Sequence, residues 1–267
     1  MRASSHVQLS RTSGTDKETL HDNLCVLADA VGRFSIGSAC SGTHVFCHSY
    51  NCNMEEWKEL TGVELPPFLC FTCEKEPWKR DFSDRHWDFQ YHFEDIELLG
   101  NDSVIDLKTG KTVVPPTVMN FNAGFCCDCI SKANNSRKHN KGQVRRALNG
   151  ETDGQMNTGR TAVGALKYIG NRLPLTVMLE NTEDLDAPGS NGEPSDLEEI
   201  VAIASSWGYV SRNQVMQSTK HGVPNARKRQ YILMWLPQCP ATGLLPMEFK
   251  SKLRMLQISQ VIPFQRL

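Results

Sequence analysis

The chain has 267 residues, of which 39% are hydrophobic and 22% charged, and its formal net charge at pH 7 is −1. This size and composition describe an ordinary globular protein with one large domain, or one domain and an appendage. The total charge neither favours nor excludes a polyanionic partner. No run approaches ~18 apolar residues, so we expect no membrane-spanning helix. The polar stretch from Met1 to Thr19 is not a signal peptide.

The ten cysteines do not have the placement of a disulfide framework. Several lie in apolar, strand-like runs, and Cys126 and Cys127 are adjacent, which favours a reducing compartment over secretion. Cys70 and Cys73 form a lone CxxC without a second pair or a histidine at finger spacing. We therefore expect two cysteines of a buried strand there, and no metal site.

The elements follow in chain order from the hydrophobic periodicity. A flexible leader precedes a helical pattern over Asp16 to Ala30. Apolar runs bounded by turn residues predict strands at Phe34–Ala39, Pro66–Thr72, Pro116–Phe125, Leu175–Leu179, Tyr209–Val215 and Arg229–Trp235. Helical patterns lie at Val45–Leu60, Trp78–Phe82, Thr161–Asn171 and Ser195–Trp207.

Three segments are less regular, and one helix has a clear start signal. His92 to Leu98 is expected to be a short strand or turn, Gly100 to Pro116 a surface excursion, and Asp184 to Glu193 a loop. Ser195 followed by Glu198 is a capping-box signature for the start of the last helix.

Strands alternate with helices along most of the chain. This alternation predicts an α/β fold with a mostly parallel sheet and helices on both faces. Ligands of such sheets bind at the carboxyl ends of the strands, and the motifs described next follow predicted strands.

Local charge is uneven. Between Ser131 and Asn149 no residue is acidic and six are Lys or Arg, namely Lys132, Arg137, Lys138, Lys141, Arg145 and Arg146. Glu180 to Glu199 is strongly acidic instead. Basic residues in the first segment would meet phosphates and make binding salt-dependent; a solvated charge run is the alternative.

The stretch Gly124-Phe125-Cys126-Cys127-Asp128-Cys129-Ile130-Ser131 lies between an apolar run and this basic segment. A thiol at the end of a strand, in electropositive surroundings, is where a nucleophilic cysteine would be placed. A buried structural cysteine is the alternative. Two later stretches are Leu179-Glu180-Asn181 and Gly222-Val223-Pro224-Asn225-Ala226-Arg227-Lys228-Arg229.

Together with the turn Cys40-Ser41-Gly42-Thr43-His44, and in this order, these stretches resemble the motifs of the cytosine-5 DNA methyltransferase family from about Phe34 to Trp235. The resemblance implies a Rossmann-like methyltransferase fold, S-adenosylmethionine as cofactor, and a nuclear location. It also implies a DNA substrate whose cytosine is flipped out of the duplex, because carbon 6 is unreachable in stacked DNA.

The resemblance assigns the catalytic roles to Cys127, Glu180, Arg227 and Arg229. Addition of the Cys127 thiolate to carbon 6 makes the ring enamine-like, so carbon 5 can attack a sulfonium methyl group. Glu180 would hydrogen-bond the cytosine amino group and ring nitrogen 3 as a general acid. Alternation along a strand puts Arg227 and Arg229 on one face, where guanidinium donors could hold the cytosine carbonyl and a phosphate.

The resemblance also assigns the cofactor site. Ser41, Gly42 and Thr43 form the turn that approaches the cofactor, with Cys40 in the family's aromatic position and His44 in place of its second glycine. Glu74 would bind the ribose hydroxyls, and Glu76 is a nearby rival. Asp95 and Ile96 match the pair whose aspartate receives the adenine amino group. Thr158 to Leu166 matches an intervening motif without an assigned role.

Several positions depart from the family pattern. Cys126 replaces a proline, Asp128 a glutamine, and Asn225 a glutamine. The family continues into a target-recognition region, for which the residues after Leu236 are too few, so a fragment or a reduced form is expected. The domain prediction is a leader and first helix at 1–30, a catalytic domain at 31–240, and at 241–267 a tail or the start of the recognition region.

Two other functions stay open. One is RNA cytosine-5 methylation by a member of the same family, which parallel assays on duplex DNA and transfer RNA would separate. The other is a non-catalytic cofactor- or DNA-binding remnant, for which a failure to bind the cofactor would speak.

Overall fold

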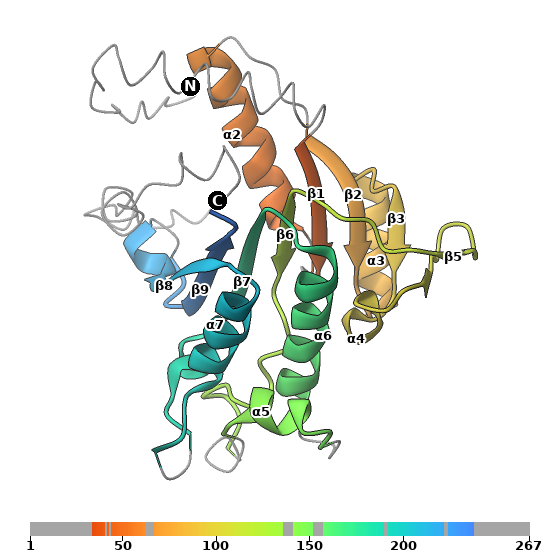
Figure 1. The fold of residues 1–267 in the computed structure, drawn as a ribbon. Coiled ribbons are helices and arrows are strands. Elements are labelled where there is room, and N and C mark those ends of the chain that lie inside the picture. The colour runs from red at the N-terminus through yellow and green to blue at the C-terminus, as the bar shows by residue number, and fades with distance from the viewer. Residues whose placement is uncertain are drawn as a thin grey trace.

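The computed structural model describes residues 34–40, 42, 44–61, 67–135, 141–151, 157–189, 192–221 and 224–237 (Figure 1). The expected leader, the helix over Asp16 to Ala30 and the tail at 241–267 lie outside these residues. Within them, the chain forms a seven-stranded sheet with helices packed on it.

The strand order in the large sheet is β3-β2-β1-β6-β7-β9-β8. Its strands are β1 (Phe34–Ala39), β2 (Pro67–Cys73), β3 (Tyr91–Phe93), β6 (Asn120–Ala123), β7 (Thr176–Thr182), β8 (Val210–Gln217) and β9 (Lys228–Trp235). The pairs from β3 to β7 are parallel, and β9 runs antiparallel to both β7 and β8. The prediction of a mostly parallel sheet is confirmed.

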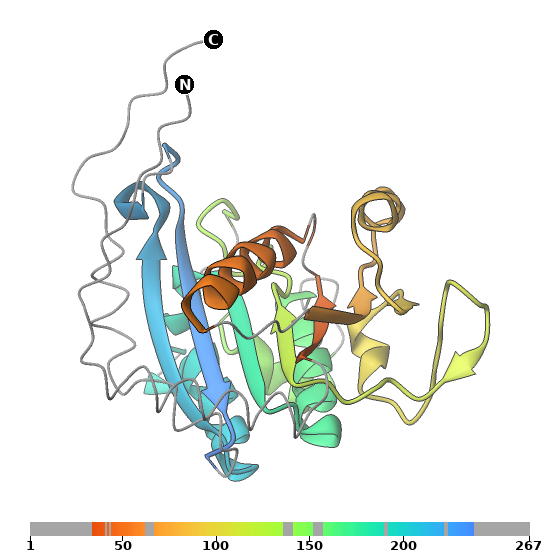
Figure 2. The ribbon, with the colours of Figure 1, turned by 90° about the horizontal axis from the view of Figure 1, so that it is seen from above.

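Helices cover both faces of this sheet, as predicted. They are α2 (Val45–Thr61), α3 (Pro77–His86), α4 (Ile96–Leu99), α5 (Gln143–Leu148), α6 (Asn157–Arg172) and α7 (Asp196–Ser206). Figure 2 shows α2 and α3 over one face and α6 and α7 over the other. The capping box at Ser195 is confirmed: its hydroxyl accepts from the Glu198 N–H at 3.2 Å, and its own N–H donates to the Glu198 carboxylate at 2.8 Å.

The core between the sheet and α6 is aromatic. Phe71 of β2 contacts Phe93 and Phe121 of the strands near it, and Tyr168 of α6 lies against Phe71 and Phe121. All four rings are buried, and each such burial contributes roughly 2 kcal/mol to folding. The Tyr168 hydroxyl is buried with its partner, because it donates to the Pro116 carbonyl at 2.7 Å.

Three boundaries differ from the sequence expectation. The strand expected from Pro116 begins only at Asn120, because a proline has no N–H to donate to a sheet ladder. The segment His92 to Leu98 divides into the end of β3 and the start of α4. The surface excursion after Gly100 contains a small antiparallel hairpin of β4 (Val104–Ile105) and β5 (Thr112–Val113).

Two short elements complete the described chain. The 3-10 helix η2 (Glu183–Asp186) directly follows β7, and η4 (Ser218–His221) follows β8. Among the helices of the described residues, none has the length and apolar character needed to cross a membrane.

Candidate active site

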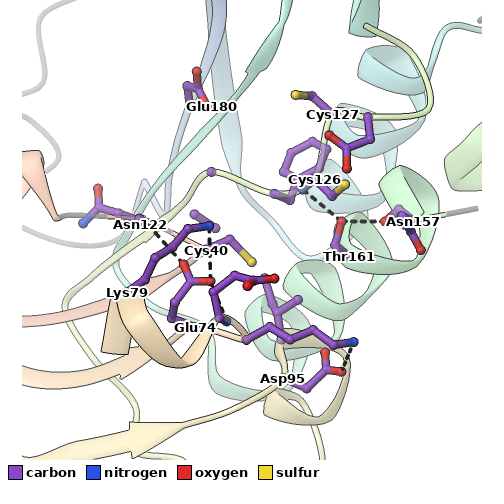
Figure 3. Close-up of a pocket in the computed structure, with 18 of the residues that line it drawn as sticks. Cys40, Glu74, Lys79, Asp95, Asn122, Cys126, Cys127, Asn157, Thr161 and Glu180 are labelled. Carbon is purple, nitrogen blue, oxygen red and sulfur yellow. Dashed lines mark hydrogen bonds and ion pairs between the residues drawn. The ribbon is translucent and has the colours of Figure 1, made fainter. Parts of the chain in front are cut away.

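A cavity of about 760 Å³ opens at the carboxyl ends of β1, β2, β6 and β7, beside the start of β9. It collects every predicted site residue that the structure describes: Gly42, Glu74, Asp95, Ile96, Cys127, Glu180, Arg227 and Arg229. Ser41 and Thr43 lie outside the described residues. In Figure 3, Glu74 and Asp95 are at one end of the cavity, and Cys127 and Glu180 are at the other.

The turn after β1 keeps a glycine-like backbone at three positions. Gly42 has φ +58°, and Cys40 and His44 have φ of 51° and 55°, in the left-handed region that L residues with a side chain rarely adopt. The buried ring of His44 is held at both nitrogens, by the Ser38 hydroxyl at 3.4 Å and the Thr72 hydroxyl at 3.1 Å. These contacts offset the backbone strain at a position where the family has glycine.

Desolvation lowers the pKa of His44 to about 4. The ring is therefore neutral at neutral pH, and it acts as an anchor between β1 and β2. It does not add a positive charge to the cavity.

Glu74 is fixed by the same turn. Its buried carboxylate accepts the Gly42 N–H at 3.3 Å and the Glu76 N–H at 3.2 Å, and the Lys79 ammonium lies 3.7 Å from it. The rival, Glu76, is exposed. The geometry thus favours Glu74 as the acid presented at the end of β2.

Asp95 caps the short helix α4. One carboxylate oxygen accepts the Glu97 N–H at 3.0 Å, and the other lies 3.2 Å from the Lys75 ammonium. Ile96, next in the chain, is buried at the cavity wall. An amino group of a ligand would therefore share Asp95 with Lys75, a feature that the sequence pattern did not indicate.

The loop that carries Cys127 is held from two sides. Asn181, buried at the end of β7, donates its amide to the Phe125 carbonyl at 2.9 Å. On the other side, hydroxyls of α6 accept two N–H groups of the loop: Thr161 from Cys126 at 3.1 Å and Thr158 from Cys129 at 3.3 Å (Figure 3 draws the Thr161 bond). The two threonines were missed as site residues. Their signal was two hydroxyls one helical turn apart, on one face at the start of a helix.

Gly124 is required by close approach. A Cβ at this position would lie 3.2 Å from the Cys40 carbonyl and 3.4 Å from the Glu180 carboxylate. The strand end of β6 therefore passes between the first turn and Glu180 only because residue 124 has no side chain.

Glu180 and the two arginines form one cluster. In the β7–β9 pairing Glu180 lies opposite Tyr231, so Arg229 is its diagonal neighbour on the same face. The Arg229 Nε lies 2.8 Å from the Glu180 Oε1, and an Arg227 Nη2 lies 3.9 Å from the same oxygen. Burial raises the pKa of Glu180 and the two guanidinium groups lower it, with a net upward shift.

The electrostatic surroundings of Cys127 are mixed. Burial raises the pKa of its thiol, Arg229 and Arg227 lower it, and Asp128 and Glu180 raise it, so the pKa lies above the ordinary value. The expectation of electropositive surroundings is thus right about the arginines, but their effect is smaller than that of burial. The thiol is protonated at neutral pH in this state and must lose its proton when it reacts.

The basic segment after the cysteine is largely paired with acids of this chain. Lys132 pairs with Glu183, Arg146 with Glu151, and Arg145 with Glu193 and Glu199. Arg137 and Lys138 lie outside the described residues. The predicted phosphate contacts of this segment remain a prediction, and any such contact at these pairs would compete with a carboxylate.

Comparisons with known proteins agree with the motif pattern. No protein-family model matches the chain. Among curated proteins, the chain is 23% identical over 233 residues to the DNA (cytosine-5-)-methyltransferase DMT5 of Cryptococcus neoformans var. grubii. The match covers 87% of this chain but only 9% of that protein. The chain resembles the cytosine-5 methyltransferases.

Solved structures give a more distant similarity. The Dnmt2 methyltransferase of S. pombe aligns with a TM-score of 0.45 at 13% identity, over 76% of this chain and 50% of that chain. The methyltransferase EhMeth of Entamoeba histolytica aligns with a TM-score of 0.44 at 14% identity, over 76% and 53%. The chain thus spans about half the length of these proteins. The fold assignment rests on the sheet itself, whose order and antiparallel β9 are those of Rossmann-like S-adenosylmethionine-dependent methyltransferases.

One departure from the cytosine-5 methyltransferase pattern has a structural counterpart. Residue 126 is a cysteine where the family has proline, and unlike proline it has a backbone N–H to satisfy. The Thr161 hydroxyl accepts that N–H and donates in turn to the Asn157 carbonyl at 2.8 Å. A hydrogen bond here restrains the loop that a proline ring would otherwise stiffen.

Replacing Thr161 by valine is expected to destabilise the protein by about 1–2 kcal/mol, because the N–H of Cys126 loses its acceptor in a partly buried place. Thr161→Ser keeps the hydroxyl and is expected to stay close to the wild type. Urea unfolding followed by circular dichroism measures both. Equal losses for the two variants would assign the effect to the lost methyl group instead of the hydrogen bond.

Proposed function

We propose that this chain is an S-adenosylmethionine-dependent methyltransferase that methylates carbon 5 of cytosine in DNA through a covalent adduct on Cys127. One observation supports this above all: the residues assigned to the cofactor and those assigned to the base line opposite ends of a single cavity (Figure 3). The resemblance to a DNA (cytosine-5-)-methyltransferase points the same way. A nuclear location is part of the same proposal.

The cavity suits the proposed cofactor. Its volume of about 760 Å³ lies within the range of roughly 300–1,000 Å³ typical of small-molecule sites. Glu74 offers a buried carboxylate at the end of β2, able to accept hydrogen bonds from two vicinal hydroxyls. Asp95 offers a second carboxylate for an amino group. When bound, S-adenosylmethionine would supply an electrophilic methyl group.

The chain's own residues would perform the other tasks. Cys127 would add as a thiolate to carbon 6, which raises the nucleophilicity of carbon 5. Glu180, with its raised pKa, would donate a proton to ring nitrogen 3 and so favour the addition. Arg227 and Arg229 would hold the carbonyl of the base beside Glu180. After methylation, loss of the carbon 5 proton and elimination of the thiolate would release the product.

Loss of the Glu74 carboxylate is expected to weaken cofactor binding about 10- to 100-fold, the value of one or two charge-assisted hydrogen bonds. Isothermal titration of Glu74→Ala with S-adenosylmethionine measures the change. Glu76→Ala is the matched control, because Glu76 lines the same cavity but is exposed. A large loss in Glu76→Ala with none in Glu74→Ala would give the role to the rival.

The substrate is tested by transfer of a labelled methyl group to cytosine-containing duplex DNA and, in parallel, to transfer RNA. The proposal expects label in DNA. Label in RNA alone would replace the substrate with RNA and keep the chemistry. A protein that binds cofactor and DNA yet labels neither nucleic acid would contradict the catalytic proposal and favour a binding remnant.

A further inference from the structure

A single carboxylate joins two lysines at the edge of the candidate site. Glu183 pairs with the Lys132 ammonium through Oε1 and with the Lys228 ammonium through Oε2, the latter at 3.4 Å. The two ammonium groups hold the pKa of Glu183 below its usual range. The carboxylate is therefore ionised and bridges two cations from distant parts of the chain.

These three residues connect the segments that carry the proposed catalytic groups. Lys132 follows Cys127 by five residues. Lys228 lies between Arg227 and Arg229 at the start of β9, and Glu183 begins η2, directly after the strand of Glu180. The lysines are accessible, with side-chain exposures of 61% for Lys132 and 50% for Lys228, whereas Glu183 between them is 24% exposed.

Stability does not explain this arrangement. Ion pairs with exposed partners contribute little to folding, because both ions remain hydrated and two long side chains lose conformational freedom. Two ammonium groups sharing one carboxylate also leave a net positive charge at this place. The cluster therefore has the charge of an anion-binding site in which an internal anion already occupies the centre.

We propose that Lys132 and Lys228 bind one backbone phosphate of the nucleic-acid substrate, and that Glu183 occupies this place until the phosphate displaces it. A phosphodiester resembles the Glu183 carboxylate in the property that matters here, one negative charge shared by two outer oxygens, each able to accept from an ammonium group. Binding would thus exchange one pair of partners for another. This proposal rests on the proposed function only in taking a nucleic acid as the ligand.

The exchange predicts a characteristic salt dependence. In the wild type, Glu183 competes for both lysines, so part of the phosphate affinity is lost. In Glu183→Gln the competing charge is gone, so we expect affinity for a short duplex to rise about 3- to 10-fold at low salt, with a steeper dependence of log K on log salt by up to about one unit per added phosphate contact. Lys132→Ala and Lys228→Ala are expected to weaken binding and flatten this dependence.

Fluorescence anisotropy of a labelled duplex, titrated with the full chain over a series of salt concentrations, measures these changes. Glu151→Gln is the matched control: it alters the net charge equally and removes the partner of Arg146, 2.7 Å away, but neither residue lines the cavity. Its affinity is expected to stay near that of the wild type. The triple variant with Glu183→Gln, Lys132→Ala and Lys228→Ala is expected to lose the gain of Glu183→Gln.

The outcomes separate the two proposals. Equal binding by Glu183→Gln and the wild type, or an equal gain in Glu151→Gln, would overturn the phosphate site while nucleic-acid binding stands. A wild type that binds cofactor but no nucleic acid would remove the proposed substrate, and an unchanged Glu183→Gln in that experiment overturns the phosphate site as well. Competition by inorganic phosphate at equal charge concentration would assign the site to free phosphate and not to a nucleic-acid backbone.

Discussion

Replacing Cys127 by serine is expected to abolish methyl transfer, with a fall in rate of at least ~1,000-fold, because a hydroxyl is a far weaker nucleophile than a thiolate and no covalent adduct forms. The change removes one sulfur atom and leaves the loop contacts of Phe125, Cys126 and Cys129 in place. Cofactor affinity is therefore expected to remain. Transfer of labelled methyl groups to duplex DNA measures the rate, and calorimetry with S-adenosylmethionine checks the binding.

Cys126→Ser is the matched control for this substitution. Cys126 is the adjacent thiol and lines the same cavity, but burial raises its pKa to about 12, so it is a poor source of thiolate. The variant is expected to keep most of the activity. If Cys126→Ser were inactive and Cys127→Ser active, the nucleophile would be one residue earlier in the chain.

Replacing Glu180 by glutamine is expected to lower the methylation rate by about 100- to 10,000-fold, the usual contribution of a positioned general acid. The glutamine amide still fits between Tyr231 and the arginines but cannot donate a proton to the base. The loss is expected in kcat more than in nucleic-acid affinity, because Arg227 and Arg229 lose a competing carboxylate. Asp184→Asn, two residues beyond β7 and not at the cavity, is the control.

The pH profile gives an independent check on Glu180. Its pKa is raised by burial, so the acid form persists to higher pH than for an exposed glutamate, and activity is expected to fall as pH rises through this raised pKa. The thiol of Cys127 titrates in the opposite sense, since activity rises as it deprotonates. In Glu180→Gln the falling limb is expected to disappear from the residual activity. Its persistence would assign that limb to another group.

Much of this fold follows from local sequence patterns. The alternation of apolar runs and helical periodicity is a property of neighbouring residues, so the order of elements and the capping box at Ser195 could be predicted. The motif residues could also be brought to one edge of the sheet, because parallel strands of a doubly covered sheet end on the same side.

The supporting contacts could not be predicted, because they join residues far apart in the chain. Cys126 and Thr161 are 35 positions apart, and Asn181 and Phe125 are 56 apart. The pairing of Asp95 with Lys75 and the double pairing of Glu183 depend in the same way on how loops meet in space. The sign of the pKa shift of Cys127 depends on burial, which a basic segment in the sequence does not report.

The most direct measurement of the central claim is the mass of the product formed with a duplex that contains 5-fluorocytosine, in the presence of S-adenosylmethionine. Fluorine at carbon 5 cannot leave as the proton does, so the adduct cannot eliminate and stays on the enzyme. The account predicts a covalent protein–DNA complex attached through the peptide that contains Cys127, and none from Cys127→Ser. A wild-type protein that binds both cofactor and duplex but forms no adduct, or forms one at another residue, would contradict it.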